Sequence, residues 1–439
     1  MPRILGRFGD RRLETAGADL FARLMEVGPS GASVRRLGGD RAGEIRFGRF
    51  LSNPRVTPKE MIDTAAARTM DRVKGLHVLV PQDTTTLRDD GDQNSLNLHG
   101  MIAVDALSGA VLGPVHAEFL RRTGGKKQDC GKRPFEEKES FRWLTATRAA
   151  VKLLEAGAAC VTMVADRECD IYDEFALRPP GVELVIRVHH DRVLDDGQRL
   201  FSCAQDLVEL GRETISLPAA PGRPAREAVL ALRARVVTLK RPHRNRAEET
   251  AKLPRRLHLT LVEAREVDPP AGATPAHWRL LTTHAVGSFA SARLITGFYR
   301  FRWNIEQVHR TMKTEGFRIE ASRVAEGGPF ENLTIATWIA AVQVMQMVGE
   351  RDGTAGRPLE DVFDPEDRPA LEAACATVQG KTARQKNPHR RGTLAYATWV
   401  CARLGGWNGY YGRAGPIVIL RGLLWFKAMH RGWKIGRLI

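Results

Sequence analysis

Between residues 77 and 188 the chain alternates short apolar runs with amphipathic segments, and this alternation restricts the fold more than any other feature. The expected elements, in order, are strands at 77–83, 101–105 and 110–115, a helix at 136–156, a strand at 161–166, a helix at 171–177 and a strand at 182–188. A Leu-Ser-Gly turn joins the second and third strands, and Gly157 is typical of a helix end. The pattern predicts an α/β fold with a mixed sheet and flanking helices.

Two of these strands end in an acid, Asp83 and Asp166. The end of a strand is a rigid place for a reactive side chain. The order of three strands, helix, strand, helix and strand is the layout of ribonuclease-H-like catalytic domains, an analogy at the level of the fold. Residues from 191 to about 290 interrupt the pattern with alternating apolar segments, which we interpret as a β-rich insertion.

Helical segments flank this region on both sides. We expect three domains: a helical DNA-binding domain at 1–62, a ribonuclease-H-like catalytic domain at 63–320, and a helical C-terminal domain at 321–439. The first domain is rich in arginine, and the last contains a basic linker at 380–391 and a Trp/Gly-rich end that is either core or an interface. The arginines of the first domain are Arg35, Arg36, Arg41, Arg46, Arg49 and Arg55.

The balance of charge favours a polyanionic partner. The 439 residues carry a formal net charge of +16, with 43% hydrophobic and 27% charged residues, as in a globular protein. Nucleic acid is a better candidate than a membrane surface, since neither a basic amphipathic anchor nor 18 consecutive apolar residues occur. We expect a cytoplasmic protein without a signal peptide. The six cysteines lack C-x-x-C spacing, so a zinc site or disulfide framework is not expected.

Residues 298–315 form the most distinctive stretch. Read as one helix at about 100° per residue, it places Tyr299, Arg302, Glu306 and Lys313 on one narrow stripe beside an apolar face. One interpretation is an ordinary ion pair between Arg302 and Glu306, which would stabilise the helix by a few tenths of a kcal/mol. The other interpretation is a site at which a single carboxylate is surrounded by phosphate-binding groups.

Asp83, Asp166 and Glu306 supply three carboxylates that could converge on a metal. Oxygen ligands without His or Cys favour Mg²⁺, with Mn²⁺ as a substitute, and two such ions can clamp the oxygens of a phosphoryl transfer. The cations of the helix could hold phosphates, and Trp278 and Trp303 offer faces for an unstacked base or pack in the core. Alternative acids beyond the fourth strand are Glu168, Asp170 and Asp173.

Several motifs are similar to those of the Asp-Asp-Glu transposases of insertion-sequence family four. They are Gln82-Asp-Thr-Thr85, Ala165-Asp-Arg-Glu-Cys-Asp-Ile171 and Tyr299-x-x-Arg-Trp-x-Ile-Glu-x-x-His-x-x-x-Lys-Thr314, with further likeness over nearly the whole chain. The resemblance implies cut-and-paste transposition of a bacterial insertion sequence, with nicking, hairpin formation and joining of 3′ ends.

The resemblance also implies roles for individual residues and partners. Asp83, Asp166 and Glu306 would bind two Mg²⁺ ions, and a homodimer would pair two double-stranded DNA ends through its C-terminal helices. DNA would be contacted by Tyr299, Arg302, Lys313, Trp278 and Arg187. Two alternatives are a metal-dependent nuclease without strand transfer and a non-catalytic DNA-binding copy.

Overall fold

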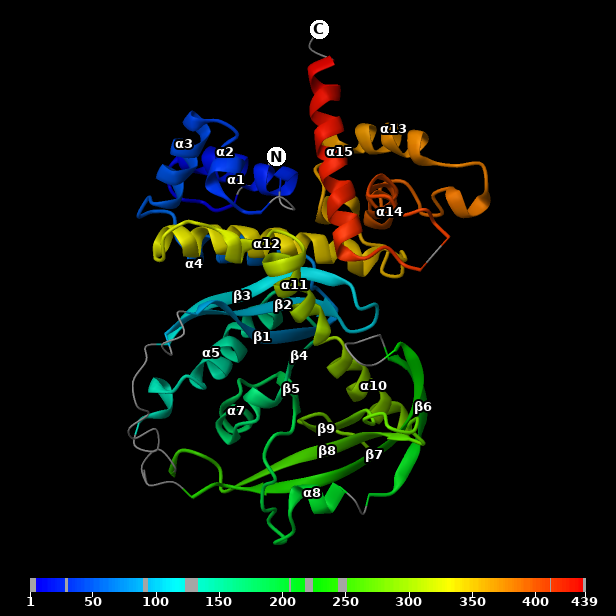
Figure 1. The fold of residues 1–439 in the computed structure, drawn as a ribbon. Helices are drawn as coiled ribbons and strands as arrows, with labels where there is room; N and C mark the ends of the chain where they lie inside the picture. Colours follow the sequence, from blue (N-terminus) through cyan, green and yellow to red (C-terminus); the bar gives the residue numbers. More distant parts are fainter. Residues whose placement is uncertain are drawn as a thin grey trace. The chain divides into compact units, whose positions relative to one another are not determined.

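The computed structural model describes residues 5–27, 31–89, 94–122, 133–204, 207–217, 224–243, 251–410 and 412–436 (Figure 1). The chain forms two compact units. The first unit contains Met1–Lys74, Thr84–Gly124 and Asn304–Ile439, and the second contains Gly75–Asp83 and Gly125–Trp303. The class is mixed α/β, with a nine-stranded, mostly antiparallel sheet among the described residues. The expected division into three domains stays a prediction.

Seven strands line up in the second unit in the order β1-β4-β5-β9-β8-β7-β6. The strands are β1 (His77–Asp89), which continues into the first unit after Asp83, β4 (Cys160–Ala165), β5 (Val182–Arg187), β6 (Glu209–Leu217), β7 (Arg226–Lys240), β8 (Arg256–Val267) and β9 (His277–Thr282). β1, β4 and β5 are parallel, and the remaining pairs are antiparallel. β4 is buried except at Cys160, and the parts of β1 and β5 beside it are mostly buried, as expected for strands covered on both faces.

The helices of the second unit are η2 (Phe135–Glu137), α5 (Phe141–Ala149), α6 (Val151–Glu155), η3 (Arg167–Cys169), α7 (Tyr172–Leu177), α8 (Leu200–Cys203) and α10 (Phe289–Arg300). In Figure 1, α10 lies on one side of β4 and β5, and α5 and α7 lie on the other. The expected single helix at 136–156 is wrong, because the segment is broken into three short helices. The expected end is correct, since Gly157 has a φ of 91°.

The interrupting region is rich in strands, as predicted. β7 and β8 pair over their length from Val229↔Val267 to Lys240↔Arg256, and β8 pairs with β9, which contains Trp278. Part of the basic stretch at 240–246, namely 244–246, lies outside the described residues. The sheet therefore extends from the parallel strands into an antiparallel meander.

The first unit contains the rest of β1 with β2 (Ser95–Asp105) and β3 (Val111–Arg122), in the order β3-β2-β1. β2 and β3 are antiparallel, and the turn between them contains Gly109 with a φ of 74°, as expected. The helices are α1 (Arg11–Val27), α2 (Val34–Gly38), α3 (Arg41–Leu51), α4 (Pro58–Met70), α11 (Trp303–Arg310), which begins at the last residue of the second unit, the π-helical η5 (Thr311–Glu315), η6 (Ile319–Ala321), α12 (Gly328–Glu350), η7 (Leu359–Asp361), η8 (Pro365–Asp367), α13 (Arg368–Val378), η9 (Ala383–Gln385), α14 (Leu394–Leu404) and α15 (Pro416–Gly436).

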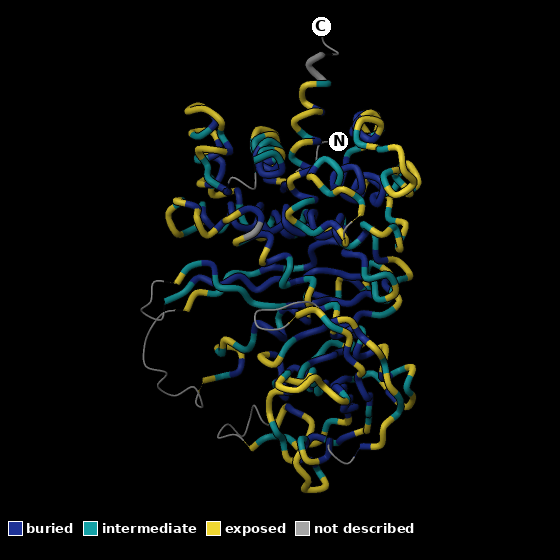
Figure 2. Tube along the Cα trace, turned by 45° about the vertical axis from the view of Figure 1, so that its right-hand side comes forward, coloured by how far each residue is buried: buried dark blue, intermediate teal, exposed yellow. Residues whose placement is uncertain are grey.

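The core of the first unit is built around α12. This helix is apolar all round and buried along nearly its whole length, which fits a helix covered on every side (Figure 2). It contacts α4, β3, α14 and α15. Gly100 on β2 allows close packing, since an added Cβ would lie 2.9 Å from the ring of Trp338.

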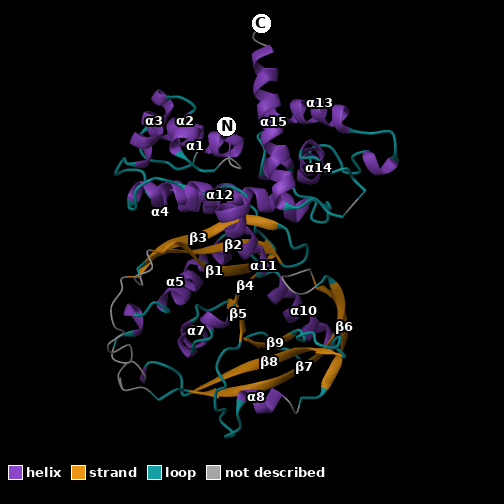
Figure 3. Ribbon diagram, in the orientation of Figure 1, coloured by secondary structure: helices purple, strands orange, loops and turns teal. Residues whose placement is uncertain are grey.

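Both ends of the first unit's chain are helical, as predicted (Figure 3). No helix in the described part of the chain has the length and apolar character needed to cross a bilayer. The five cysteines in the described ranges are free, and Cys130 lies outside those ranges.

Candidate functional site

Three predicted site residues form one row across the neighbouring parallel strands. Asp166 directly follows β4 and Arg187 ends β5, but Asp83 lies within β1, which continues to Asp89, so the expected strand end at Asp83 is wrong. The β1–β4 register runs from His77↔Cys160 to Pro81↔Val164, and its extension by two residues pairs Asp83 with Asp166. The β4–β5 register ends at Ala165↔Ile186, and its extension by one residue pairs Asp166 with Arg187. Neighbouring strands lie about 4.8 Å apart, so Asp166 and Arg187 are adjacent, and Asp83 lies two residues beyond the last β1–β4 pair.

Asp166 is surrounded by a hydroxyl group and two guanidinium groups of the second unit. The Tyr299 hydroxyl donates to Asp166 Oδ1 at 3.1 Å. Arg187 Nη1 lies 3.7 Å from Oδ1, and Arg302 Nη2 lies 3.8 Å from Oδ2. The Asp166 side chain is 33% exposed, so solvent reaches it despite these neighbours. The arrangement places one accessible carboxylate between two cations.

Tyr299 is buried on α10 and stays protonated. Burial raises the pKa of its hydroxyl, and the negative charge of Asp166 raises it further, while Arg302 and Arg187 oppose the shift. The phenol therefore remains a hydrogen-bond donor to Asp166 at neutral pH. Trp278 on β9 packs against it, with the two ring centroids 5.8 Å apart.

The expected continuous helix at 298–315 is wrong. The chain forms α10, a turn at residues 301–302, α11 and then a π-helical segment, so one 100° spacing does not hold throughout. α10 begins with a capping box between Ser288 and Ser291. Arg302, in the turn, is buried with its guanidinium 5.5 Å from the Trp303 ring centroid, while Trp303 is 57% exposed. The apolar prediction holds for Phe298, Ile305, Val308 and Met312, and Phe301 is half-buried.

Glu306 and Lys313 belong to the first unit. Glu306 lies on α11 and is half-buried. Lys313 Nζ donates to Thr86 O at 2.7 Å and lies 2.8 Å from a carboxylate oxygen of Glu320. The chain therefore fixes this amine against β1, three residues beyond Asp83 in sequence.

His309 on α11 is buried and neutral. Burial lowers its pKa to about 3, and the nearby positive charge of Lys313 contributes in the same direction. A neutral imidazole beside the lysine avoids repulsion between two cations. The sequence motif contains this histidine, but its role is structural in the contacts described.

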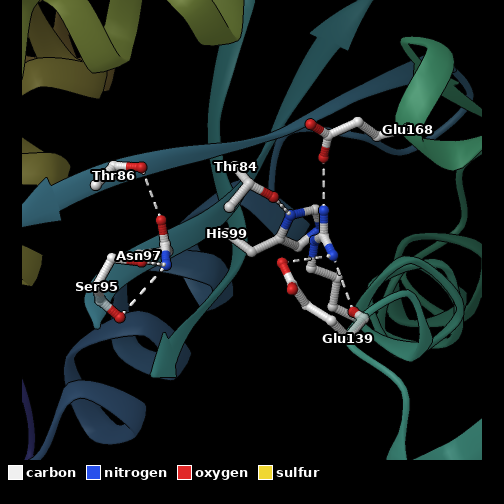
Figure 4. A network of polar contacts seen from close by, with 8 residues as sticks. Thr84, Thr86, Ser95, Asn97, His99, Glu139 and Glu168 are labelled. Carbon is white, nitrogen blue, oxygen red and sulfur yellow. Dashed lines mark hydrogen bonds and ion pairs between the residues drawn. The ribbon is translucent and has the colours of Figure 1, made fainter. Parts of the chain in front are cut away.

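A polar network follows Asp83 along β1 in the first unit (Figure 4). The Thr84 hydroxyl lies 2.9 Å from His99 Nδ1, and the Thr86 hydroxyl donates to Asn97 Oδ1 at 2.8 Å. Asn97 in turn donates to the Ser95 hydroxyl at 2.9 Å. These bonds fix the strand that leads away from Asp83.

The alternative acids have structural partners. Glu168 accepts from Arg142 at 2.7 Å, and Asp173 is buried. Asp170 is buried and accepts from two backbone N–H groups and Arg192. Glu168 is more exposed than Asp166 but pairs with the buried Arg142, so position directly after β4, rather than exposure alone, distinguishes Asp166.

No group of three or more His, Cys, Asp or Glu side chains suited to a metal occurs among the residues that the structure describes. Asp83 and Asp166 nevertheless form a pair of carboxylates in one row. Mg²⁺ often uses one or two protein carboxylates and fills its other positions with water or phosphate oxygens. The donor set thus fits a hard divalent cation.

The six arginines predicted as a DNA-binding feature are all exposed. Three of them, Arg41, Arg46 and Arg49, lie on α3, where Ile45 is exposed on the same face. Arg41 pairs with Glu44 and Arg46 with Asp19, as surface ion pairs. Within the described ranges, Arg35, Arg36, Arg49 and Arg55 have no ion-pair partner. No family model matches the chain.

Proposed function

We propose that the chain is a metal-dependent DNA transposase that cuts an insertion sequence from one DNA site and joins its 3′ ends to another. The observation that carries this proposal is the row of Asp83, Asp166 and Arg187 across three neighbouring parallel strands. Acids for a hard cation and a cation for a phosphate are thereby adjacent, which is what phosphoryl transfer requires.

The strand order supports a ribonuclease-H-like catalytic fold. The first five strands follow the order β3-β2-β1-β4-β5, with β2 and β3 antiparallel and β1, β4 and β5 parallel. Along the chain, three strands, helices, a strand, a helix and a strand follow one another, in the order that the sequence predicts. The strands β6–β9 would then be an insertion, as the sequence suggests.

Each residue of the proposed site has a chemical role. Asp83 and Asp166 would hold Mg²⁺ or Mn²⁺, with Glu306 as the proposed third ligand. The bound metal would activate the attacking oxygen and stabilise charge on the leaving oxygen. Tyr299 orients Asp166 through its hydroxyl, and Arg187 and Arg302 provide positive charge for a phosphate.

Three side chains extend the proposed DNA contacts. Trp303 offers an exposed ring, and Trp278 supports Tyr299 and could stack on an unpaired base. Lys313 is proposed to supply a further amine that binds a phosphate of the DNA. The exposed arginines of α2 and α3 would bind the DNA backbone, so binding of the ends should weaken steeply with salt.

We further propose that the protein works as a homodimer on two DNA ends. Support comes from the C-terminal helix α15, where Ile417, Trp425 and Met429 are exposed, with Trp425 at 59%. The spacing from 425 to 429 places two of these residues on one helix face. An exposed tryptophan on an apolar stripe is typical of a surface that another chain covers.

The experiment is cleavage of labelled DNA carrying the element's own ends, with purified protein and Mg²⁺, followed on a denaturing gel. Asp83→Asn, Asp166→Asn and Glu306→Gln are each expected to abolish cleavage while binding of the ends remains. The matched control is Glu168→Gln, which removes an exposed acid two residues from Asp166 and is expected to cleave normally.

The products distinguish the alternatives. Nicks, hairpin-length products and joined ends support the transposase. Cleavage without joining would indicate a nuclease, and binding without cleavage a non-catalytic copy. Retained cleavage in Asp83→Asn or Asp166→Asn would contradict the proposed metal site.

A further inference from the structure

A cavity of about 590 Å³ lies in the C-terminal part of the first unit, and no residue of the proposed catalytic row lines it. Its volume is in the usual range for small-molecule sites. The lining residues come from the end of α12, the basic segment around η9, α14 and the loop before α15. They include Arg351, Arg384, Lys386, Trp399, Trp407 and Arg413.

The lining is strongly cationic. It contains four side chains that carry positive charge, Arg351, Arg384, Lys386 and Arg413, against one carboxylate, Asp352. Asp352 lies 3.3 Å from Arg413, so that pair is internally balanced. Within the described part of the chain, Arg384 and Lys386 have no ion-pair partner. The remaining positive charge favours an anionic ligand.

Two buried polar groups of the lining also lack partners. Thr398 is 1% exposed, and its hydroxyl has no hydrogen-bond partner in the described ranges. Arg351 donates to Ala414 O at 3.2 Å, but its Nε is buried without a partner there. Since buried polar groups are normally hydrogen-bonded, these two residues of the lining have hydrogen-bonding capacity that the described chain does not use.

Two indole rings give the cavity an aromatic component. Trp407 is half-buried, and its Nε1–H donates to Gly412 O at 3.2 Å, which fixes the ring. Trp399 is buried, with the Arg403 guanidinium 5.7 Å from its ring centroid. An indole ring beside cations suits a ligand with a planar aromatic base that stacks on the ring and a negative group that binds the cations.

We propose that this cavity binds a nucleotide unit, with its phosphate on the cationic side chains and its base against the Trp407 ring. The nucleotide could be free in solution or part of a DNA strand, and the chemistry of recognition is the same for both. The site is additional to the proposed catalytic row, because it uses neither acids for a metal nor any residue of that row.

The test measures binding to the full chain by titration calorimetry, with AMP, adenosine and ribose 5-phosphate as separate probes. AMP is expected to bind at least about 10-fold more tightly than either fragment, because only AMP contains both the charge and the base. Equal binding of AMP and ribose 5-phosphate would overturn the role of the aromatic component. Absence of AMP binding would overturn the proposal.

Charge variants distinguish binding in the cavity from general attraction of an anion to a basic protein. Arg384→Gln with Lys386→Gln removes two exposed cations of the lining and is expected to weaken AMP binding about 10-fold or more. The matched control is Lys381→Gln with Arg390→Gln, which removes the same charge from exposed residues of the same segment outside the lining. Equal losses in the two pairs would contradict a specific site.

An aromatic variant tests the base contact. Trp407→Ala is expected to reduce AMP binding about 10-fold and leave ribose 5-phosphate binding unchanged, while Trp407→Phe keeps a ring and restores most of the affinity. Circular dichroism establishes that each variant is folded. Unchanged AMP binding by a folded Trp407→Ala variant would contradict the proposal.

The source of the nucleotide is distinguished by competition. A five-residue oligo(dA) that displaces AMP from the unmodified chain, but not from the Arg384/Lys386 variant, would assign the cavity to a nucleotide within a DNA strand. AMP binding that the oligonucleotide leaves unchanged would assign it to a free nucleotide. Failure of DNA cleavage in the earlier assay would leave this binding result standing, so the two proposals fail separately.

Discussion

Two aspartates four residues apart, Asp166 and Asp170, are held in opposite ways. Asp170 has a fully buried side chain and accepts from His189 N at 2.7 Å, His190 N at 2.9 Å and Arg192 Nη1 at 2.6 Å. Asp166 is one third exposed, and its contacts are 3.1 to 3.8 Å long. Both acids face arginine, but only Asp170 is saturated by short bonds.

The difference separates a structural acid from an available one. Arg192 also donates to Asp170 O at 2.6 Å, so the aspartate connects the end of η3 to the segment that follows β5. Its oxygens are used inside the protein. The longer contacts of Asp166 fix its direction and leave its oxygens open to a ligand, which is the property a metal or substrate site requires.

The largest expected effect comes from Asp170→Ala. The change removes the buried carboxylate that accepts from two backbone N–H groups and pairs with Arg192, so the free energy of unfolding should fall by about 3–5 kcal/mol, although Arg192 keeps its bond to Asp170 O. Asp166→Ala should cost about 1 kcal/mol or less, because the Asp166 side chain is one third exposed and its ion-pair contacts are long. Urea denaturation of both variants at pH 7 checks the contrast, and similar losses would remove the distinction drawn between the two acids.

A third carboxylate of this region, Glu174 on α7, is buried without a cation bonded to it. Burial raises its pKa from 4.5 to about 7, against opposing effects of the Thr147 hydrogen bond and the Arg148 charge. Between pH 4.5 and about pH 7 the folded state binds more protons than the unfolded state, so the free energy of unfolding falls as pH rises. The free energy of unfolding falls by about 1.4 kcal/mol per pH unit, and the total loss reaches about 3 kcal/mol above pH 7.

Glu174→Gln should remove this dependence, because the amide resembles the protonated acid. The variant is expected to gain up to about 3 kcal/mol at pH 8 and nothing at pH 4. The measurement is urea denaturation across that range. Glu155→Gln, the same change at an exposed helix position, is the control and should leave the slope unaltered. If the free energy of unfolding of the Glu174 variant depended on pH as steeply as that of the unmodified chain, the buried carboxylate would not titrate as described.

The sequence predicted the positions of the parallel strands better than the faces of helices. Apolar runs located β1, β4 and β5, although β1 continues beyond the expected end at Asp83 to Asp89. The prediction of one continuous helix at 298–315 failed because a turn at Arg302 and the π-helical segment interrupt the regular spacing of 100° per residue. That change depends on tertiary packing, which periodicity in one sequence does not contain.

The C-terminal cavity could not be predicted for a related reason. The segment at 380–391 has the composition of a basic linker, yet its Arg384 and Lys386 line a cavity with Trp399 and Trp407. These residues are close in space because α14 and the loop before α15 bring them together. Asp170 shows the same limit, since sequence alone does not reveal that Arg192 and two backbone N–H groups converge on it.

Tyr299→Phe tests how much of the Asp166 arrangement depends on one hydrogen bond. Loss of the 3.1 Å bond should lower the free energy of unfolding by about 1 kcal/mol. Tyr172→Phe is the matched control, because its hydroxyl donates to Pro254 O at 2.7 Å and should cost a similar amount. Under the proposed function, only Tyr299→Phe should also slow DNA cleavage. Equal cleavage rates for both variants would show that Tyr299 does not orient the available acid.

The smallest effect is expected from Glu168→Gln, which lies between the two aspartates in sequence. Glu168 is 69% exposed and pairs with the buried Arg142 at 2.7 Å. Arg142 keeps a further bond to Glu139 O at 2.9 Å after the change, so its charge is not left without acceptors. An exposed ion pair contributes little, and the loss should be about 0.5 kcal/mol. If urea denaturation showed that the free energy of unfolding falls by more than about 2 kcal/mol, Glu168 would resemble Asp170 despite its contact with solvent. Exposure would then not distinguish structural acids from available ones in this segment.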